Sequence, residues 1–260
     1  MTTTSSSTEA KPKIAIVTGG SRGLGRATVL ALAERGVDSV FTYHSNRTEA
    51  DVVAEAAAKA GRTAITVQLD VRDAASFDTF VEHVREALEK LGAQRFDFLV
   101  NNAGTSLHES FEKTTVAQLD EMYEVHFKAP YLLTQRLLPL INDGGRIVNV
   151  SSGLARFSFP GSSAYAAMKG AIEVLTRYLA KELGARGIAV NTVAPGPIAT
   201  DFSGGRVRDN PEINKQLAGV TALGRVGLPE DIGPMIASLL ADDNRWINGQ
   251  RIEVAGGVML

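Results

Sequence analysis

The chain has 260 residues, enough for one large domain with a sizeable core and without need of a second. Its 27 basic and 29 acidic residues give a formal net charge of −2, so it lacks the basic excess typical of nucleic-acid and anionic-membrane surfaces. It has no cysteine, which excludes disulfides and thiolate–zinc sites, and its four histidines show no metal-ligand spacing. We therefore expect neither a metal nor a nucleic-acid partner.

The first residues, 1–11, are rich in Ser and Thr and lack the apolar segment of a secretory signal. We expect them to be a flexible lead, with a tag remnant or a short transit segment as open alternatives, before a single domain over 12–260. No apolar run approaches the roughly 18–20 residues of a membrane span. A cytoplasmic protein without a membrane partner is therefore expected.

Strand-like and helical patterns alternate from residue 12 onward. Short apolar runs predict strands at 14–18, 40–43, 63–69, 96–100, 146–150, 188–192 and 250–254. Helical spacing predicts helices at 24–35, 49–59, 74–91, 119–140, 163–183 and 230–240, the fourth disturbed near Pro130. This alternation predicts an α/β fold with a doubly wound, mostly parallel sheet of about seven strands and helices on both faces.

A glycine turn, T-G-G-S-R-G-L-G, leads from the first strand into the first helix at Thr18–Gly25. At this position of a doubly wound sheet, glycines let the backbone approach a pyrophosphate, and the helix N-terminus offers free N–H groups. The glycine spacing departs from G-x-G-x-x-G, and a tight turn without a ligand is the alternative. Its place between strand and helix favours a nucleotide site.

The stretch Y-A-A-M-K places Tyr165 and Lys169 one helical turn apart, on the same face. An ammonium beside a phenol is expected to lower the tyrosine pKa from about 10, which would allow proton exchange near neutral pH. A half-buried tyrosine beside a surface lysine is the alternative. Ser152, 13 residues earlier, favours an active site, whereas Ser151 should point away because strand side chains alternate.

Together with N-N-A-G at 101–104 and P-G at 195–196, these motifs resemble the short-chain dehydrogenase/reductase family over about residues 12–257. Within that family the chain is similar to the single-domain ketoreductases of the 3-oxoacyl-acyl-carrier-protein reductase type. The resemblance implies that Tyr165 is the general acid/base and that Ser152 hydrogen-bonds the substrate carbonyl. Lys169 would bind the nicotinamide ribose and tune Tyr165, and the nicotinamide would carry the hydride.

The resemblance also implies a set of cofactor contacts, distributed along the chain. They are Gly19, Ser21, Arg22, Gly23, Leu24 and Gly25 in the glycine turn; Asp70 and Val71 at the adenine; Asn101, Ala103 and Gly104; Tyr165 and Lys169; and Pro195, Gly196, Ile198 and Thr200 at the carboxamide. A turn or capping role for Asp70 and a plain proline turn at Pro195 are the alternatives.

The region after the second strand, F-T-Y-H-S-N-R at 41–47, has no acid until Glu49. A carboxylate here would bind the ribose 2′-OH of NAD and repel a 2′-phosphate. Ser45, Asn46 and Arg47 instead offer a hydroxyl, an amide and a guanidinium, and Arg22 offers a second guanidinium. The sequence therefore favours NADP(H) over NAD, unless both arginines are only solvated surface charges.

One position departs from the family pattern. Where most members have an asparagine in the long helix, thought to hold a proton-relay water for the lysine, this chain has His126. A neutral imidazole can donate and accept, so it could hold the same water, and an unperturbed pKa of about 6.5 would add an acid limb to the pH–rate profile. The alternative is a histidine packed beside the site without a role.

The sequence thus predicts an NADPH-dependent carbonyl reductase/alcohol dehydrogenase, with a catalytically silent nucleotide-binding sensor or a scaffold as alternatives. Apolar residues in the expected pocket walls, 153–164 and 198–225, suit an apolar ketone. These residues are Leu154, Phe157, Phe159, Ile198, Phe202 and Leu217, while Arg156, Arg206 and Arg208 would suit an acidic or phosphopantetheine-linked compound. The choice among a bulky ketone, a 3-oxoacyl thioester and a sugar stays open.

Apolar residues on the helices at 119–140 and 163–183 exceed the needs of one sheet face. They include Tyr131, Leu132, Leu137, Leu138, Leu175 and Leu179. In the resembled family the matching helices pair between subunits. A homotetramer is therefore expected, with a dimer as the second choice.

Overall fold

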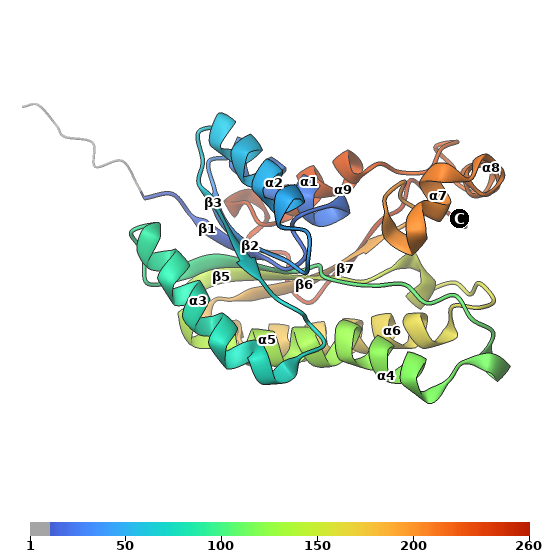
Figure 1. Ribbon diagram of the computed structural model, residues 1–260, viewed down its shortest axis with the longest axis horizontal. Helices are drawn as coiled ribbons and strands as arrows, with labels where there is room; N and C mark the ends of the chain where they lie inside the picture. The colour runs from blue at the N-terminus through green and yellow to red at the C-terminus, as the bar shows by residue number, and fades with distance from the viewer. Residues whose placement is uncertain (1–10) are drawn as a thin grey trace, which may run out of the picture.

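The computed structural model describes residues 11–260, so the expected lead at 1–11 lies outside the described residues except for Lys11. Seven strands form one parallel sheet in the order β3-β2-β1-β4-β5-β6-β7 (Figure 1). The strands are β1 (Ile14–Val17), β2 (Asp38–Tyr43), β3 (Ala64–Gln68), β4 (Phe96–Asn101), β5 (Ile141–Val150), β6 (Ala189–Pro195) and β7 (Arg251–Val254). The predicted doubly wound sheet is confirmed.

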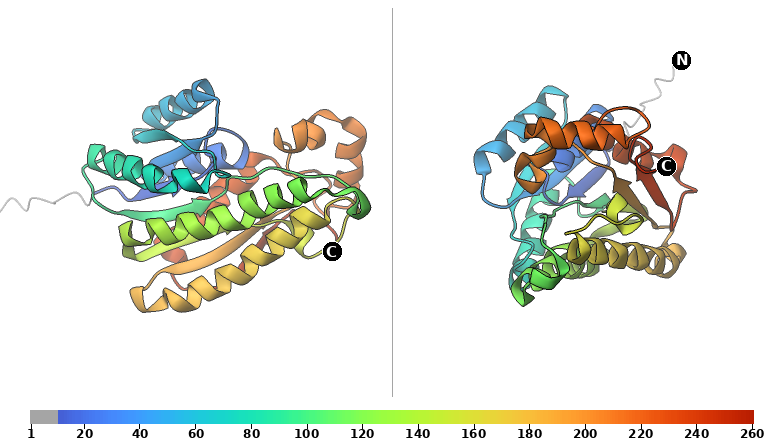
Figure 2. Two further views of the ribbon diagram at one scale, coloured as in Figure 1. Left: turned by 60° about the horizontal axis from the view of Figure 1, so that its bottom comes forward. Right: turned by 90° about the vertical axis from the view of Figure 1, so that its right-hand side faces the viewer.

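Helices cover both faces of the sheet. They are α1 (Gly23–Glu34), α2 (Arg47–Lys59), α3 (Phe77–Lys90), α4 (Val116–Tyr123), α5 (Ala129–Leu137), α6 (Ser163–Glu182), α7 (Arg206–Asp209), α8 (Pro211–Gly219) and α9 (Pro229–Leu239). In Figure 1, α1, α2 and α9 lie on one face and α3 to α6 on the other, and Figure 2 shows α6 beside the α4–α5 segment.

The two cores follow from the alternation of side chains along each strand. In β1, Ile14 and Ile16 join the core beneath α3, α5 and α6, whereas Ala15 and Val17 join the core beneath α1, α2 and α9. Because both faces are covered, β1 is apolar at every position, which is the pattern of a fully buried parallel strand.

The helix predicted at 119–140 is interrupted, as expected, beside Pro130. Between α4 and α5 the chain makes one π-helical turn, Glu124–Lys128. Pro130 has no N–H to bond the carbonyl of His126, and its ring would crowd that carbonyl in a regular helix. The wider turn relieves this conflict and places His126 on the inner side of the segment, where it is buried.

The segment that follows β6 is rich in Gly and Pro, yet it forms helices. It contains α7 and α8, which stand together at one end of the molecule (Figure 1). Asn210 caps α8, accepting hydrogen bonds from the amides of Glu212 and Ile213 at 3.0 and 3.1 Å. The local helix signals in this stretch, Asn before Pro, outweigh its breaker composition.

Candidate active site

The site begins where the strand order reverses. β1 and β4 are neighbours in the centre of the sheet, and the chain leaves their carboxyl ends in opposite directions. A Cβ built on Gly19, after β1, would lie 3.0 Å from the Cα of Ala103, after β4. The glycine turn and N-N-A-G are therefore adjacent at the crevice where doubly wound sheets bind ligands.

The glycine turn depends on close backbone packing. Gly19 has φ +67°, and a Cβ on Gly20 would lie 2.7 Å from Phe41. A Cβ on Gly25 would lie 2.1 Å from the carbonyl oxygen of Gly19. The turn is also fastened to the end of β2, where the amides of Gly19 and Gly20 bond Thr42 at 2.9 and 2.8 Å.

Asn102 holds the turn to β4, a role that the sequence analysis missed. Its Nδ2 donates to the carbonyls of Thr18 at 2.9 Å and Gly19 at 3.0 Å. In return, the hydroxyl oxygen of Thr18 accepts from the amides of Asn102 and Ala103, both at 3.0 Å. The position of Asn102 between two predicted contact residues was the available signal.

The N-terminus of α1 is open to a ligand. Arg22, the residue before the helix, has an extended backbone and makes no side-chain cap, and the first turn of α1 carries no acidic residue. Three residues predicted to bind the cofactor, Gly23, Leu24 and Gly25, form this first turn, directly after Ser21 and Arg22. Free N–H groups and the positive helix end suit a phosphate.

The predicted 2′-phosphate residues differ in their existing contacts. Asn46 caps α2, accepting from the amide of Glu49 at 3.1 Å, and the exposed Arg47 pairs with Asp51 at 2.8 Å. The side chain of Arg22 is exposed, and no acidic group of residues 11–260 lies within ion-pair distance of it. Of the two guanidiniums, Arg22 is the one without a competing partner.

Asp70 combines a turn role with its place at the end of β3. Its carboxylate accepts from the backbone amide of Arg72 at 3.0 Å and pairs with the Arg72 guanidinium at 2.8 Å. These contacts with Arg72, the side-chain hydrogen bond first, lower the pKa of Asp70 to about 2. The turn interpretation is therefore correct, and adenine contact stays a prediction.

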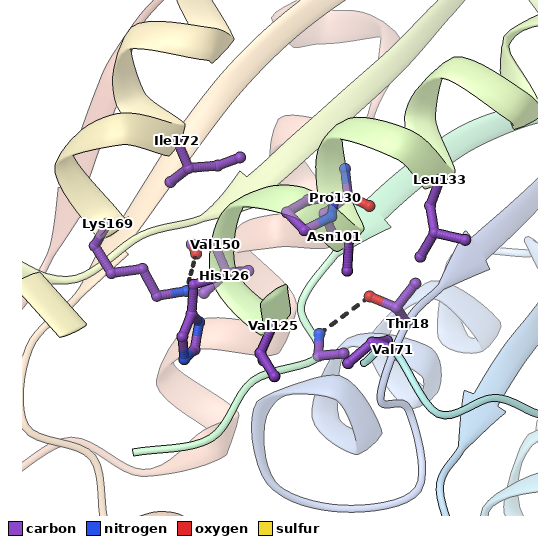
Figure 3. A pocket seen from close by; sticks show the side chains of 12 residues that line it. Thr18, Val71, Asn101, Val125, His126, Pro130, Leu133, Val150, Lys169 and Ile172 are labelled. Carbon is purple, nitrogen blue, oxygen red and sulfur yellow. Dashed lines mark hydrogen bonds between the residues drawn. The ribbon is translucent and has the colours of Figure 1, made fainter. Parts of the chain in front are cut away.

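Ser152, Tyr165 and Lys169 meet at the carboxyl end of β5. Ser152 lies two residues beyond the end of the strand, and the other two lie on α6. Lys169 is buried and donates from Nζ to the carbonyl of Val150 at 2.7 Å (Figure 3), with Nζ 5.6 Å from the centre of the Tyr165 ring. Ser151 points away, as predicted, and donates to Glu173 at 2.7 Å.

Burial reverses the predicted tuning of Tyr165. Burial raises the pKa of Tyr165 to about 12, although its hydrogen bond with Ser152 acts in the opposite direction. Burial also lowers the pKa of Lys169 to about 7. The expectation that Lys169 lowers the tyrosine pKa is therefore wrong for the protein alone, because burial disfavours the charged form of each group.

His126 lies against the catalytic pair. Its ring meets that of Tyr165 edge to face at a centroid distance of 4.9 Å, and its Nε2 bonds the carbonyl of Thr105 at 2.9 Å. A Cβ on Gly104 would lie 2.9 Å from the ring, so glycine at 104 makes room for it. Burial first, and then the charge of Lys169, lower the pKa of His126 to about 2. The predicted acid limb from His126 is therefore wrong.

A small cavity beside Lys169 is lined by polar atoms without partners. Figure 3 shows Asn101, His126 and Lys169 around it, together with Thr18 and apolar residues. Within residues 11–260, Asn101 Oδ1 and His126 Nδ1 are buried and unpaired, while Asn101 Nδ2 donates to Thr134 and Asn149. The cavity has a volume of about 10 Å³, which corresponds to roughly one water molecule.

The segment after β6 returns to the glycine turn. A Cβ on Gly23 would lie 3.7 Å from Thr200, and Gly196 packs tightly against Ala255. Ile198 lies against Gly227. Of the four residues predicted at the nicotinamide, Pro195, Gly196, Ile198 and Thr200, the last is thus brought beside the glycine turn.

One phenylalanine ring lies near the Tyr165 ring, whereas two of the predicted pocket arginines are already paired. The Phe202 ring lies 6.0 Å from that of Tyr165, and Phe157 and Phe159 pack 6.1 Å apart. Arg156 pairs with Glu253 at 2.6 Å, and Arg208 pairs with Asp201 and Asp209. These pairs weaken the prediction of an acidic substrate.

From residue 11 to the end, no helix is both long and apolar enough to span a bilayer. Across that same range, no three His, Cys, Asp or Glu side chains come together as a metal site.

Comparison with known proteins gives consistent matches over nearly the whole chain. A family model described as Enoyl-(Acyl carrier protein) reductase matches residues 19–259. An uncharacterised oxidoreductase of Methylorubrum extorquens is 37% identical, with 95% of this chain and 97% of that protein covered.

Two solved structures of enzymes with a named reaction match the fold of this chain closely. LugOII, a promiscuous reductase that catalyses keto-reduction at C1 during lugdunomycin biosynthesis, is 40% identical with a TM-score of 0.90, covering 95% of this chain and 97% of its own. The angucycline C-6 ketoreductase LanV with bound NADP is 38% identical with a TM-score of 0.90, covering 95% of each chain.

Proposed function

The chain belongs to the short-chain dehydrogenase/reductase family, and we propose that it is an NADPH-dependent reductase that converts a ketone into a secondary alcohol. One observation carries the proposal: buried Tyr165 and Lys169 share a face of α6, with Lys169 Nζ 5.6 Å from the Tyr165 ring and Ser152 beside the phenol. That cluster adjoins a glycine turn with an open helix N-terminus.

The residues present fit a nicotinamide dinucleotide. Close packing at Gly19 and Gly25 holds the glycine turn in place, and the first turn of α1, which has no side-chain cap, supplies N–H donors for a pyrophosphate. Lys169 would hold the ribose hydroxyls, and Thr200, beside Gly23, would face the nicotinamide end. When bound, the reduced nicotinamide supplies the hydride.

Tyr165 is suited to donate a proton to the developing alkoxide. Its pKa of about 12 keeps the phenol protonated at neutral pH, and an alkoxide is a much stronger base than a phenolate. Ser152 would hydrogen-bond the same oxygen and orient the carbonyl. The reverse reaction, alcohol oxidation, needs the phenolate and is therefore expected only at alkaline pH. This supports reduction as the working direction.

The substrate class that suits the pocket is an aromatic or polycyclic ketone. Phe202 is 41% exposed and its ring lies 6.0 Å from that of Tyr165, so it presents an apolar face near the phenol rather than filling the core. LugOII catalyses keto-reduction at C1 and LanV is an angucycline C-6 ketoreductase, which supports a ketone as the substrate. A 3-oxoacyl thioester is less favoured because Arg156 and Arg208 are paired.

The direct test is a panel of carbonyl compounds with NADPH, followed by absorbance of the reduced nicotinamide. The panel should pair each aromatic ketone with an aliphatic ketone and a 3-oxoacyl thioester. We expect turnover with bicyclic or larger aromatic ketones. NADPH binding without turnover on any member would contradict the proposed reductase and leave a silent nucleotide-binding protein.

We expect Arg22→Ala to raise the KM for NADPH far more than that for NADH. One charge-assisted contact with the 2′-phosphate is worth about 1.5–3 kcal/mol, or roughly 10–150-fold. Arg47→Ala should have a smaller effect because Arg47 must first leave Asp51. Steady-state kinetics with both cofactors measure this, and Arg35→Ala, an exposed arginine at the far end of α1, is the control. Equal effects on the two cofactors would contradict phosphate recognition by Arg22.

We further propose that neutral His126 takes the place of the family's asparagine in holding a water beside Lys169. Thr105 O can only accept, so its bond fixes the proton of His126 on Nε2 and leaves Nδ1 as an acceptor. Asn101 Oδ1 is a second fixed acceptor because its Nδ2 is engaged twice. A water donating to both could accept from Lys169.

His126→Asn is expected to keep activity and the shape of the pH–rate profile but to change the acid stability. The histidine pKa of about 2 in the fold lies far below about 6.5 in the unfolded chain. Below pH 6.5 the unfolded chain binds a proton that the native protein does not, so the free energy of unfolding falls as pH falls, by up to about 1.4 kcal/mol per unit. Asparagine does not titrate, so the variant lacks this contribution to the pH dependence of stability. Urea titrations at several pH values measure it, and parallel stability curves would contradict a buried neutral His126.

A homotetramer stays our proposal for the assembly, with a corrected set of contact residues. Leu137 belongs to the core, and Leu132, Leu138 and Leu179 pack against it. The exposed apolar residues on the same helices are Val116, Leu119, Tyr123, Tyr131, Val174 and Tyr178. Light scattering at micromolar concentration should give four times the chain mass, and a stable monomer would contradict the proposal.

A further inference from the structure

Four charged side chains of alternating sign form a chain behind the proposed active site. Glu173 lies on α6, Arg251 and Glu253 on β7, and Arg156 in the segment after Ser152. Arg251 Nε donates to Glu173 at 2.7 Å, and Arg251 Nη1 lies 3.2 Å from Glu253. Arg156 bonds the same Glu253 oxygen at 2.6 Å.

The guanidinium of Arg251 is fixed at three points. Besides its two carboxylate partners, its Nη2 donates to the carbonyl of Ser152 at 3.2 Å. Each of the three guanidinium nitrogens of Arg251 therefore has its own oxygen partner. The planar, fork-shaped group suits partners that lie in different directions. The side chains of Arg251 and Glu173 are 23% and 14% exposed, so this pair is less screened by solvent than a surface ion pair.

The same cluster joins the two halves of the catalytic constellation. Glu173 lies one helical turn beyond Lys169 on α6, and it accepts from Ser151, the neighbour of Ser152. Arg251 bonds Ser152 itself through the backbone. The strand end that carries Ser152 is thus tied to the helix that carries Tyr165 and Lys169.

We propose that Arg251, anchored by Glu173, is a positioning residue that sets the place of the Ser152 hydroxyl relative to Tyr165. The inference rests on the proposed function, because it assigns Arg251 an effect through Ser152. Arg251 bonds the Ser152 carbonyl rather than its hydroxyl, so it acts on geometry alone. Small displacements of a group that orients the substrate reduce turnover strongly.

The test is a double-variant comparison between Arg251→Met and Ser152→Ala. Methionine keeps the apolar stem and removes both hydrogen bonds and the ion pair with Glu253. We expect Arg251→Met to lower kcat about tenfold or more, with the Kd for NADPH little changed, since a positioning loss acts on the chemical step. Arg251→Lys, which retains one donor, should recover part of the loss. In the Ser152→Ala background, Arg251→Met should cost almost nothing further.

Arg186→Ala is the matched control. Arg186 pairs with Asp143 at 2.7 Å and donates to the carbonyls of Leu138 and Ile141, but at the other end of β5. It removes similar interactions and should leave kcat unchanged. Should Arg251→Met be unfolded at the assay temperature, Glu173→Gln, which keeps an acceptor for Arg251 without its charge, takes its place in the same comparison.

The outcomes separate the two proposals. A Ser152→Ala variant with wild-type turnover would overturn the proposed function. The positioning role would be overturned if Ser152→Ala is defective and Arg251→Met, or Glu173→Gln, still lowers kcat in that background as much as it does in the wild type. The proposed function would then stay intact. The positioning role would also be overturned if Arg251→Met, like the Arg186→Ala control, lowers only the melting temperature and leaves kcat unchanged.

Discussion

Replacing Tyr165 by phenylalanine should reduce kcat by about 10²–10⁴-fold, the usual cost of losing one general acid. The substitution removes only the hydroxyl. The ring contacts with His126 at 4.9 Å and Phe202 at 6.0 Å stay, and Lys169 keeps its bond to the carbonyl of Val150. NADPH affinity and melting temperature should therefore change little.

Single-turnover kinetics with NADPH and an aromatic ketone measure the loss in the chemical step. Tyr178→Phe is the matched control, because Tyr178 lies on the same helix and is 64% exposed. It should behave as wild type. A Tyr165→Phe variant that retains most of the turnover would remove Tyr165 from the acid role, and equal losses in both variants would indicate a general effect on the helix.

The fold and the central residues could be predicted from the sequence because they rest on local patterns. Strand and helix periodicity are encoded within about ten residues, and alternation of the two permits few topologies. Tyr165 and Lys169 share a helical face whatever surrounds them. The disturbance near Pro130 was equally local, because proline itself interrupts the helix ladder.

The burial of individual side chains and the contacts between distant residues could not be predicted from the sequence. Spacing put Lys169 beside Tyr165 but carried no information on desolvation, which decides the direction of the pKa of each group. His126 was expected to titrate for the same reason, yet it is 98% buried, at 2% exposure. The pair of Arg251 and Glu173 joins residues 78 positions apart, which no local pattern indicates.

Asn102 illustrates a third limit. The motif N-N-A-G was recognised, but only its other three members were given a role, at the cofactor, whereas the Asn102 side chain supports the glycine turn. The turn therefore depends on two kinds of residue: glycines that allow close approach, and an asparagine that bonds two carbonyls at the point of approach. This division explains why the glycine positions near Asn102 should tolerate no side chain.

Gly25→Ala is expected to weaken NADPH binding by roughly 5–150-fold, the equivalent of about 1–3 kcal/mol of overpacking. The new Cβ would lie 2.1 Å from the carbonyl oxygen of Gly19 and 2.6 Å from Asn102 Nδ2. The turn must open to relieve this contact, which displaces the backbone from the phosphate and strains both Asn102 hydrogen bonds. Helix propensity alone would predict the opposite sign, since alanine inside a helix is favoured over glycine by about 0.5–1 kcal/mol.

Titration of NADPH by fluorescence, together with thermal unfolding, separates these two tendencies. Gly184→Ala is the control, because a Cβ at this exposed position meets nothing within 4 Å. That variant should bind NADPH as wild type does and melt at a similar temperature. Gly25→Ala should lose affinity and melt lower. If Gly25→Ala instead binds NADPH normally and melts higher, the close contact between α1 and the Gly19 carbonyl does not build the phosphate site.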